Sequence, residues 1–435
     1  MYKLPLAAFW YGITFHYAYI ADINRLFDYA GYSYSAPTLL TLSATYVFIV
    51  MPVVAYRPSL APSSMGAALI FAICYVPAQL IILFTWQRLT GELLLLQLLI
   101  AASMTIILRS SVLGETTSST TQVLASRLLS LVVRVLTILA LAVFIFIYKD
   151  SIQLVGFDDV YDLRFETNKV DQGAFVNYLT SWLIYCFIPF YFARGIAQNN
   201  RNDIALGFAG SVLIYVTMAS KASILLGLIM YALSRLMRTG VDYLFTLLII
   251  LSTAVLFAVI ILPDDGVLFY GKSILLVRTL SAGGWAMANY YDFFSTHGFT
   301  FYTHIRFVDA LFNAYPYGDY SLGQLIGFEY TGGTEANFNA NFWASDAFAA
   351  LGLAGVPVVT AAICGALYLI NKSAYGYPRD FVVLWFAGFW LALLNVPLSV
   401  ALLSGGGFLT MLLLWLDSPK VNQLFRRFSG KKKIG

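Results

Sequence analysis

The chain has 435 residues, of which 60% are hydrophobic and only 11% are charged, and its mean hydropathy is +0.77. A water-soluble globule needs roughly a quarter of its residues charged, so this composition excludes a soluble enzyme, a disordered chain and a nucleic-acid-binding protein. The net charge of +4 is small, so the placement of the charges carries more information than their sum.

Apolar runs long enough to cross a bilayer recur along the whole chain, since a membrane helix needs about 20 apolar residues. We expect one all-α polytopic membrane domain over residues 1–435 with about 12 transmembrane helices, or ten to twelve because only a short turn around Pro397 separates the last two runs. Lys3 alone precedes the first run and no small-residue cleavage site follows it, so we expect a retained helix rather than a signal peptide. The runs are residues 4–20, 37–56, 65–85, 93–108, 128–147, 174–192, 204–219, 222–237, 243–262, 347–370, 381–396 and 400–416.

The basic residues are distributed unequally between the two sets of connecting segments. If the N-terminus is cytoplasmic, the inner segments hold 16 Lys and Arg and five acidic residues, whereas the outer segments hold nine basic and 17 acidic residues. Cytoplasmic loops of membrane proteins carry the excess of Lys and Arg. The sequence therefore predicts twelve spans with both termini in the cytoplasm.

Two predicted outer segments are long and polar, namely residues 149–173 and residues 263–346. The second is rich in Trp, Tyr and Phe interleaved with Arg, His and Asp. Unstructured loops of this length are uncommon and usually functional. We expect helices near residues 273–295 and 303–313, lying on or near the membrane because aromatic rings favour its interface.

Three cations are candidates for binding an anionic ligand at the outer face. Lys221 lies in the small-residue break Ala-Ser-Lys-Ala-Ser, and Arg278 and Arg306 lie in the large outer segment. Arginine binds phosphate with two parallel hydrogen bonds, so the three side chains are predicted to converge on one outward-facing cavity and hold a pyrophosphate. The alternatives are a turn lysine that extends to the interface and ordinary surface arginines, with Arg306 paired to Asp309.

His304 is the candidate general base for a sugar hydroxyl because histidine titrates near neutrality; the alternative is an interfacial side chain. No metal is predicted. The first outer segment contains Asp22-Ile23-Asn24-Arg25 rather than a D-x-D or E-x-D pattern, and adjacent aspartates such as Asp264 and Asp265 point apart in a regular element. Zinc, Walker and serine-hydrolase motifs are also missing from the sequence, and no cofactor is expected.

One stretch carries a family resemblance. The segment E-A-N-F-N-A-N-F-W at residues 335–343, followed by F-A-A-L-G-L-A-G-V at 348–356, resembles the Asn-rich loop and helix entry that close the large periplasmic loop of bacterial O-antigen polymerases, the Wzy-type oligosaccharide repeat-unit polymerases. The order of the Ser-Lys-Ala-Ser break, Arg278 and Arg164 is also similar, so the resemblance covers roughly residues 150–370.

The resemblance implies a GT-C-like, metal-independent glycosyltransferase of the bacterial inner membrane with a periplasmic active site. Its substrates would be sugar repeat units on undecaprenyl pyrophosphate, and a polysaccharide chain-length regulator would be a membrane partner. His304, Arg278 and Arg306 would be catalytic, and Lys221, Arg278 and Arg164 would bind pyrophosphate. The predicted sugar-binding residues are Asn337, Asn339, Asn341, Tyr290 and Tyr302.

Two other functions compete with polymerisation. O-antigen ligases share the general plan but usually carry a His-Asn pair before G-x-x-G, where this chain has Asn341-Phe342. A lipid-linked oligosaccharide flippase or transporter would place ionisable residues at mid-membrane on several helices. Here only Arg134 and Lys221 are candidates for such a depth, which favours the polymerase.

Overall fold

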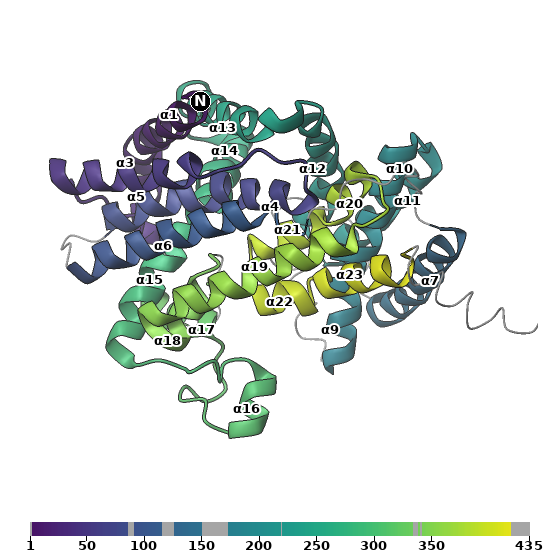
Figure 1. The fold of residues 1–435 in the computed structure, drawn as a ribbon. Coiled ribbons are helices and arrows are strands. Elements are labelled where there is room, and N and C mark those ends of the chain that lie inside the picture. The colour runs from purple at the N-terminus through teal and green to yellow at the C-terminus, as the bar shows by residue number, and fades with distance from the viewer. Residues whose placement is uncertain are drawn as a thin grey trace, which may run out of the picture.

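The computed structural model describes residues 2–85, 91–114, 126–149, 173–218, 220–333, 338–339 and 342–418. All regular secondary structure in these ranges is helical (Figure 1), as the sequence predicts. The predicted outer segment 149–173, with Arg164, falls almost entirely outside the described residues, as do Asn337 and Asn341.

The helices of the first half follow the predicted apolar runs closely. They are α1 (Lys3–Ala18), continued by the π-helical turn η1 (Tyr19–Asn24), α2 (Arg25–Phe27) and η2 (Asp28–Ala30); α3 (Leu39–Val54); α4 (Pro62–Leu69), η3 (Ile70–Tyr75) and α5 (Val76–Thr85) as one helix; α6 (Gly91–Ser110); α7 (Arg127–Tyr148); and α9 (Gly173–Trp182), η5 (Leu183–Phe187) and α10 (Ile188–Gln198), again as one helix.

The second half alternates long helices with short ones. They are α11 (Arg201–Met218); α12 (Lys221–Met237); η6 (Gly240–Asp242) with α13 (Tyr243–Ile261); α14 (Gly266–Ser273), η7 (Ile274–Ser281) and α15 (Ala282–His297) in one continuous run; α16 (Arg306–Phe312); α17 (Leu322–Thr331); α18 (Ser345–Leu351), η8 (Gly352–Ala354) and α19 (Gly355–Ser373); α20 (Arg379–Trp385) and α21 (Ala387–Leu393); and α22 (Leu398–Leu403) with α23 (Gly407–Leu416).

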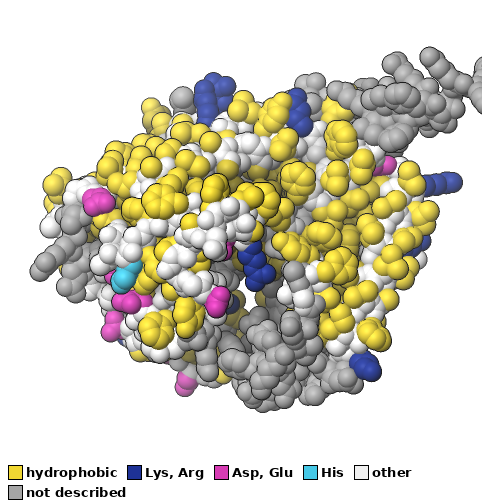
Figure 2. Space-filling view, turned by 90° about the horizontal axis from the view of Figure 1, so that it is seen from below, with side chains coloured by type: hydrophobic (Ala, Val, Ile, Leu, Met, Phe, Trp, Pro, Cys, Tyr) yellow, Lys and Arg dark blue, Asp and Glu magenta, His cyan; other side chains and the backbone are white. Residues whose placement is uncertain are grey.

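Seven described helical segments are long and apolar enough to cross a membrane, so the chain is an all-α, multi-pass membrane protein. The shorter apolar helices at Leu39–Val54 and Ser223–Met237 fall below that length. Figure 2 shows a broad hydrophobic area over one face, with acidic and histidine side chains gathered toward one side of it. The seven segments are Pro62–Thr85, Gly91–Ser110, Arg127–Tyr148, Phe175–Gln198, Gly240–Ile261, Ser345–Ser373 and Leu398–Leu416.

Two of the π-helical turns directly precede a proline. η3 ends two residues before Pro77, and η5 ends two residues before Pro189. Proline has no N–H, and its ring clashes with the carbonyl four residues earlier. The wider π turn is one way to keep the helix continuous past that position.

Contacts between helix ends agree with the predicted alternation of the chain. Tyr56 donates a hydrogen bond to Tyr243 at the start of α13, with 2.8 Å between the hydroxyl oxygens. At the other end of α13, Asp264 shares ion-pair partners with Asp22 from η1. The sequence places Tyr56 and Tyr243 on one predicted side and Asp22 and Asp264 on the other, so each contact joins residues predicted to share a side.

The structure corrects the expectation for the segment around residues 273–295. It does form a helix, but α15 packs against α5 and α18 inside the bundle rather than lying on the membrane surface. Its aromatic residues Trp285, Tyr290, Phe293 and Phe294 are buried. Gly284 permits the close approach, since a Cβ there would lie 2.7 Å from the Cα of Ala78. Aromatic residues suit a helical core as well as an interface, so composition alone did not separate the two.

Helix α16 is arranged differently. It extends away from the bundle beyond α17 and α18 (Figure 1), and Phe307, Leu311 and Phe312 on it are exposed. The second outer segment therefore contains both a core helix and a peripheral one.

Candidate functional site

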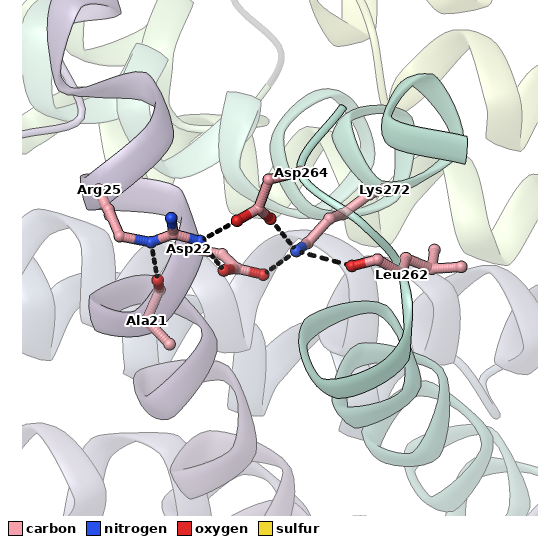
Figure 3. Close-up of polar contacts among 6 residues, drawn as sticks. All are labelled: Ala21, Asp22, Arg25, Leu262, Asp264 and Lys272. Carbon is pink, nitrogen blue, oxygen red and sulfur yellow. Dashed lines mark hydrogen bonds and ion pairs between the residues drawn. The ribbon is translucent and has the colours of Figure 1, made fainter. Parts of the chain in front are cut away.

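Four charged residues join η1 and α2 to the start of the α14–η7–α15 helix (Figure 3). The Lys272 ammonium lies 2.6 Å from Asp22 Oδ2 and 2.7 Å from Asp264 Oδ1, while Arg25 lies 3.0 Å from Asp22 Oδ1 and 2.5 Å from Asp264 Oδ2. The side chains of Lys272 and Asp22 are 2% and 4% exposed. We call these four residues the ion cluster; its two positive and two negative charges cancel.

The electrostatics of the ion cluster follow from this geometry. Burial lowers the pKa of the Lys272 ammonium, but Asp22 and Asp264 outweigh that effect and raise it above its usual value. Lys272 and then Arg25 lower the pKa of the Asp264 carboxyl. Lys272 and Asp264 therefore stay charged near neutral pH. In the structure, Asp22 and Asp264 are ion-pair partners of Lys272 and Arg25.

Arg278 lies in η7, six residues after Lys272, and its surroundings are different. Its side chain is exposed, and within the part of the chain that the structure describes no carboxylate lies within 4.0 Å of it. Burial raises the pKa of the Tyr32 hydroxyl, and the positive charge of Arg278 opposes that rise. Among the described residues, Arg278 therefore has no acidic partner.

Tyr32 belongs to a group of rings centred on Trp285. The ring centroid of Trp285 lies 6.0 Å from that of Tyr32, 5.8 Å from that of Tyr330 and 4.6 Å from that of Phe338. The Trp285 indole N–H donates to the carbonyl of Gly31 at 3.2 Å. We call Tyr32, Trp285, Tyr330 and Phe338 the aromatic group. Asn339, a predicted sugar-binding residue, directly follows Phe338 and is exposed.

Tyr290 lies deeper than a sugar-binding residue is expected to lie. Its ring is fully buried, and its hydroxyl donates to the carbonyl of Phe338 at 3.1 Å. Burial raises the pKa of Tyr290 well above its usual value, and the charge of Asp346 adds to the rise. In this conformation Tyr290 therefore supports the backbone at Phe338, and direct sugar contact by Tyr290 stays a prediction.

Asp346 is a residue that sequence reasoning missed. It lies in the first turn of α18, is 4% exposed, and its Oδ1 has no hydrogen-bond partner in the described part of the chain. Its charge acts on Tyr290 and also on Tyr302, whose pKa burial and then Asp346 raise to about 12. The signal available in the sequence was an aspartate inside the apolar run around residues 343–351, next to the quoted motif.

The hydrogen bonds around His304 are compatible with a proton on Nδ1. When the Thr300 hydroxyl donates to the carbonyl of Ala349 at 3.2 Å, its oxygen accepts from His304 Nδ1 at 2.8 Å. In that tautomer His304 Nε2 carries the lone pair, and it is buried with no hydrogen-bond partner among the described residues. Burial lowers the pKa of His304 to about 4, so the ring is neutral near pH 7.

The segment that carries His304, residues 298–305, is held against the end of α18. The backbone N–H groups of Thr300 and Phe301 donate to the carbonyls of Ala349 and Ala350 at 2.8 and 2.9 Å. Phe301 and Tyr302 both have positive φ, 51° and 62°. Such backbone conformations cost free energy in residues with a side chain and concentrate at functional sites.

The remaining predicted residues are not joined to this site by any described contact. Arg306 is exposed at the start of α16 and forms no ion pair among the described residues; Asp309 instead accepts from the Tyr315 backbone N–H at 3.1 Å. Lys221 begins α12, but its side chain lies outside the described residues, as do all of Arg164, Asn337 and Asn341. Convergence of Arg278, Arg306 and Lys221 stays a prediction.

No family model, curated protein or solved structure matches this chain. Among the described residues, no group of three or more His, Cys, Asp and Glu side chains is placed to hold a metal ion. Arg278, the aromatic group and His304 are therefore the candidate functional groups among the described residues.

Proposed function

We propose that this protein is a membrane glycosyltransferase of the O-antigen polymerase type. It joins undecaprenyl-pyrophosphate-linked oligosaccharide repeat units at the periplasmic face of the bacterial inner membrane, without a metal or other cofactor. The proposal includes a GT-C-like arrangement with about twelve spans and both termini in the cytoplasm. The observation that carries it is the exposed Arg278, which has no carboxylate partner among the described residues and lies on the same helical run as Trp285 of the aromatic group.

Arg278 supplies the group that a pyrophosphate leaving group needs. Negative charge builds on the pyrophosphate as its bond to the sugar breaks, and a fixed guanidinium stabilises that charge in the transition state. An arginine already paired to a carboxylate would lose this capacity, and among the described residues Arg278 has no such partner. Arg306, Lys221 and Arg164 are proposed as further cations of the same site.

The aromatic group supplies a surface for sugar rings. Tyr330 is 41% exposed, and its hydroxyl lies 3.3 Å from Asp292 Oδ2, which gives both a ring face and polar partners. Asn339 extends the same edge. Amphipathic rings with a polar tip are suited to ligands that are apolar on one face and hydroxylated at their edges. Asn337, Asn341 and Tyr302 complete the proposed sugar-binding set.

His304 is proposed to remove the proton of the acceptor hydroxyl. The hydroxyl oxygen forms a bond to the donor's anomeric carbon, the bond from that carbon to the pyrophosphate oxygen breaks, and its electron pair leaves with undecaprenyl pyrophosphate. The hydroxyl proton passes to His304 Nε2, whose lone pair is free. Because Nε2 is enclosed, the segment 298–305 has to move away from Ala349 and Ala350 for substrate to enter.

A deletion strain distinguishes this proposal from its rivals. Loss of a polymerase leaves lipid A–core capped with a single repeat unit, whereas loss of a ligase or a flippase leaves it uncapped. Elongation of lipid-linked repeat units by the purified protein in vesicles is the direct test. Uncapped core in the deletion strain, or failure of the purified protein to elongate such units, would contradict the proposal.

A further inference from the structure

The ion cluster lies between two segments that meet again at the proposed active site. From Asp22 the chain runs through α2 and η2 to Tyr32, and from Lys272 the helix runs through η7 to Arg278 and Trp285. Tyr32 packs beside Trp285, with 6.0 Å between ring centroids. The two segments are thus fixed to each other at one end by charges, and beyond that end they carry Arg278, Tyr32 and Trp285.

Two further contacts hold these segments in place. Phe27 stacks on Phe269, with 5.7 Å between ring centroids and 4° between ring planes. Asn24 donates to the carbonyl of Tyr32 at 2.9 Å, which ties the turn after α2 back to η1. A displacement of Lys272 relative to Asp22 would therefore shift Arg278 relative to Tyr32.

Because the Asp22–Lys272 ion pair is buried, its geometry is narrowly constrained. A charged pair at 2.6 Å with both side chains almost fully enclosed tolerates little movement, because separation leaves two buried charges unpaired. Buried ion pairs give little net stability compared with apolar residues of similar size, and their best supported role is to fix one arrangement among several.

We propose that Asp22 and Lys272 are positioning residues for Arg278: their buried ion pair fixes the helix that carries Arg278 relative to the segment that carries Tyr32, and so sets the affinity of Arg278 for the pyrophosphate of the lipid-linked substrate. This inference rests on the proposed function only in taking Arg278 as a pyrophosphate ligand. It assigns Asp22 and Lys272 no contact with substrate.

The test uses the double variant Asp22→Asn/Lys272→Met in the full-length protein. It removes one charge of each sign, leaves Arg25 and Asp264 as a pair, and so avoids an unpaired buried charge. The matched control is Arg194→Met/Asp203→Asn, which removes the ion pair between α10 and α11 (3.2 Å, with Asp203 4% exposed). Inorganic pyrophosphate is the probe, and the rise that it causes in the thermal unfolding midpoint is the readout.

We expect pyrophosphate to raise the midpoint of the wild type and of the Arg194/Asp203 control with the same concentration dependence. In the Asp22/Lys272 double variant the apparent affinity should fall about tenfold to a hundredfold, although its midpoint without pyrophosphate stays near that of the wild type. The single variant Lys272→Arg, which keeps the positive charge, should retain most of the wild-type affinity for pyrophosphate.

The possible failures are distinguishable. If the wild type does not respond to pyrophosphate, or if Arg278→Ala responds like the wild type, the pyrophosphate role of Arg278 is wrong and the positioning role is wrong with it. If Arg278→Ala loses the response and the double variant keeps it, positioning alone is overturned. A double variant that merely unfolds early but binds pyrophosphate normally also overturns it, since a structural role lowers the midpoint and not the affinity.

Discussion

Lys272 and Arg278 lie six residues apart on one continuous helix, yet their environments are opposite. Lys272 is enclosed between two carboxylates, whereas Arg278 is exposed and has no carboxylate partner among the described residues. The first charge is already neutralised by the fold, and the second is available to a ligand. The comparison separates a cation that holds the structure from one that can do chemistry, although both are basic residues of the same outer segment.

Removing the free cation should have the largest effect, and on activity rather than stability. Arg278→Ala should lower kcat/KM for lipid-linked repeat units by about 10²–10³-fold, the usual cost of removing a group that stabilises transition-state charge. Arg278→Lys should also be severely impaired because it keeps the charge but loses the two parallel hydrogen bonds. Steady-state elongation assays give both values. Near-normal activity of Arg278→Ala would remove Arg278 from the site.

Removing Lys272, the paired cation, should mainly lower stability. Lys272→Met leaves Asp22 buried with only the exposed Arg25 as partner, so the free energy of unfolding should fall by about 3 kcal/mol. Arg25→Gln is the control, and it should change stability by less than about 1 kcal/mol because the Arg25 side chain is 53% exposed and its loss leaves Asp22 paired with Lys272. Equilibrium unfolding in detergent measures both. Equal losses in the two variants would break the distinction between buried and exposed members of the cluster.

The histidines of the outer segment allow a second comparison of the same kind. His304 has an enclosed Nε2 lone pair, whereas His297 is exposed and stacks on Phe293, with 4.3 Å between ring centroids. If His304 is the general base, His304→Ala should lower kcat by about 10²-fold, and His297→Ala should leave it nearly unchanged. Equal, small effects would identify His304 as an ordinary interfacial residue.

The pH dependence follows from the direction of the His304 shift. Since burial lowers the pKa of His304 to about 4, the base is unprotonated across the physiological range. We expect kcat/KM to be flat from about pH 8 down to about pH 5 and to fall only near pH 4. The contribution of His304 to unfolding free energy should be complete above its ordinary pKa of about 6.5 and be lost as the pH falls toward 4. An acid limb centred near pH 6.5 would contradict an enclosed base.

The smallest expected effect is that of metal removal. If Arg278 and His304 suffice, excess EDTA should leave elongation unchanged, and added Mg²⁺ or Mn²⁺ should not increase it. Radiolabelled repeat-unit elongation with and without EDTA is the measurement. Activity that disappears with EDTA and returns with a divalent cation would overturn the metal-independent mechanism.

The fold class and most helix positions could be predicted from the sequence. Apolar runs such as 65–85 and 128–147 became helices within a few residues of the predicted limits, because burial in lipid requires every backbone group to be paired within its own segment. Hydropathy also located the polar segment that holds Arg278 and His304. These features depend on local composition, which a single sequence contains.

Which polar residues are available for chemistry depends on contacts between segments that are distant in the sequence. Lys272 and Arg278 look alike in sequence, and the partner that separates them, Asp22, lies about 250 residues earlier. Likewise, Tyr290 was expected to contact sugar at the surface, but it is a core side chain because α15 is buried. The hydrogen bonds of His304 depend on Thr300 and, through it, on the carbonyl of Ala349. Ion pairing, burial and hydrogen bonding between distant segments are properties of packing, and no local pattern of residues specifies them.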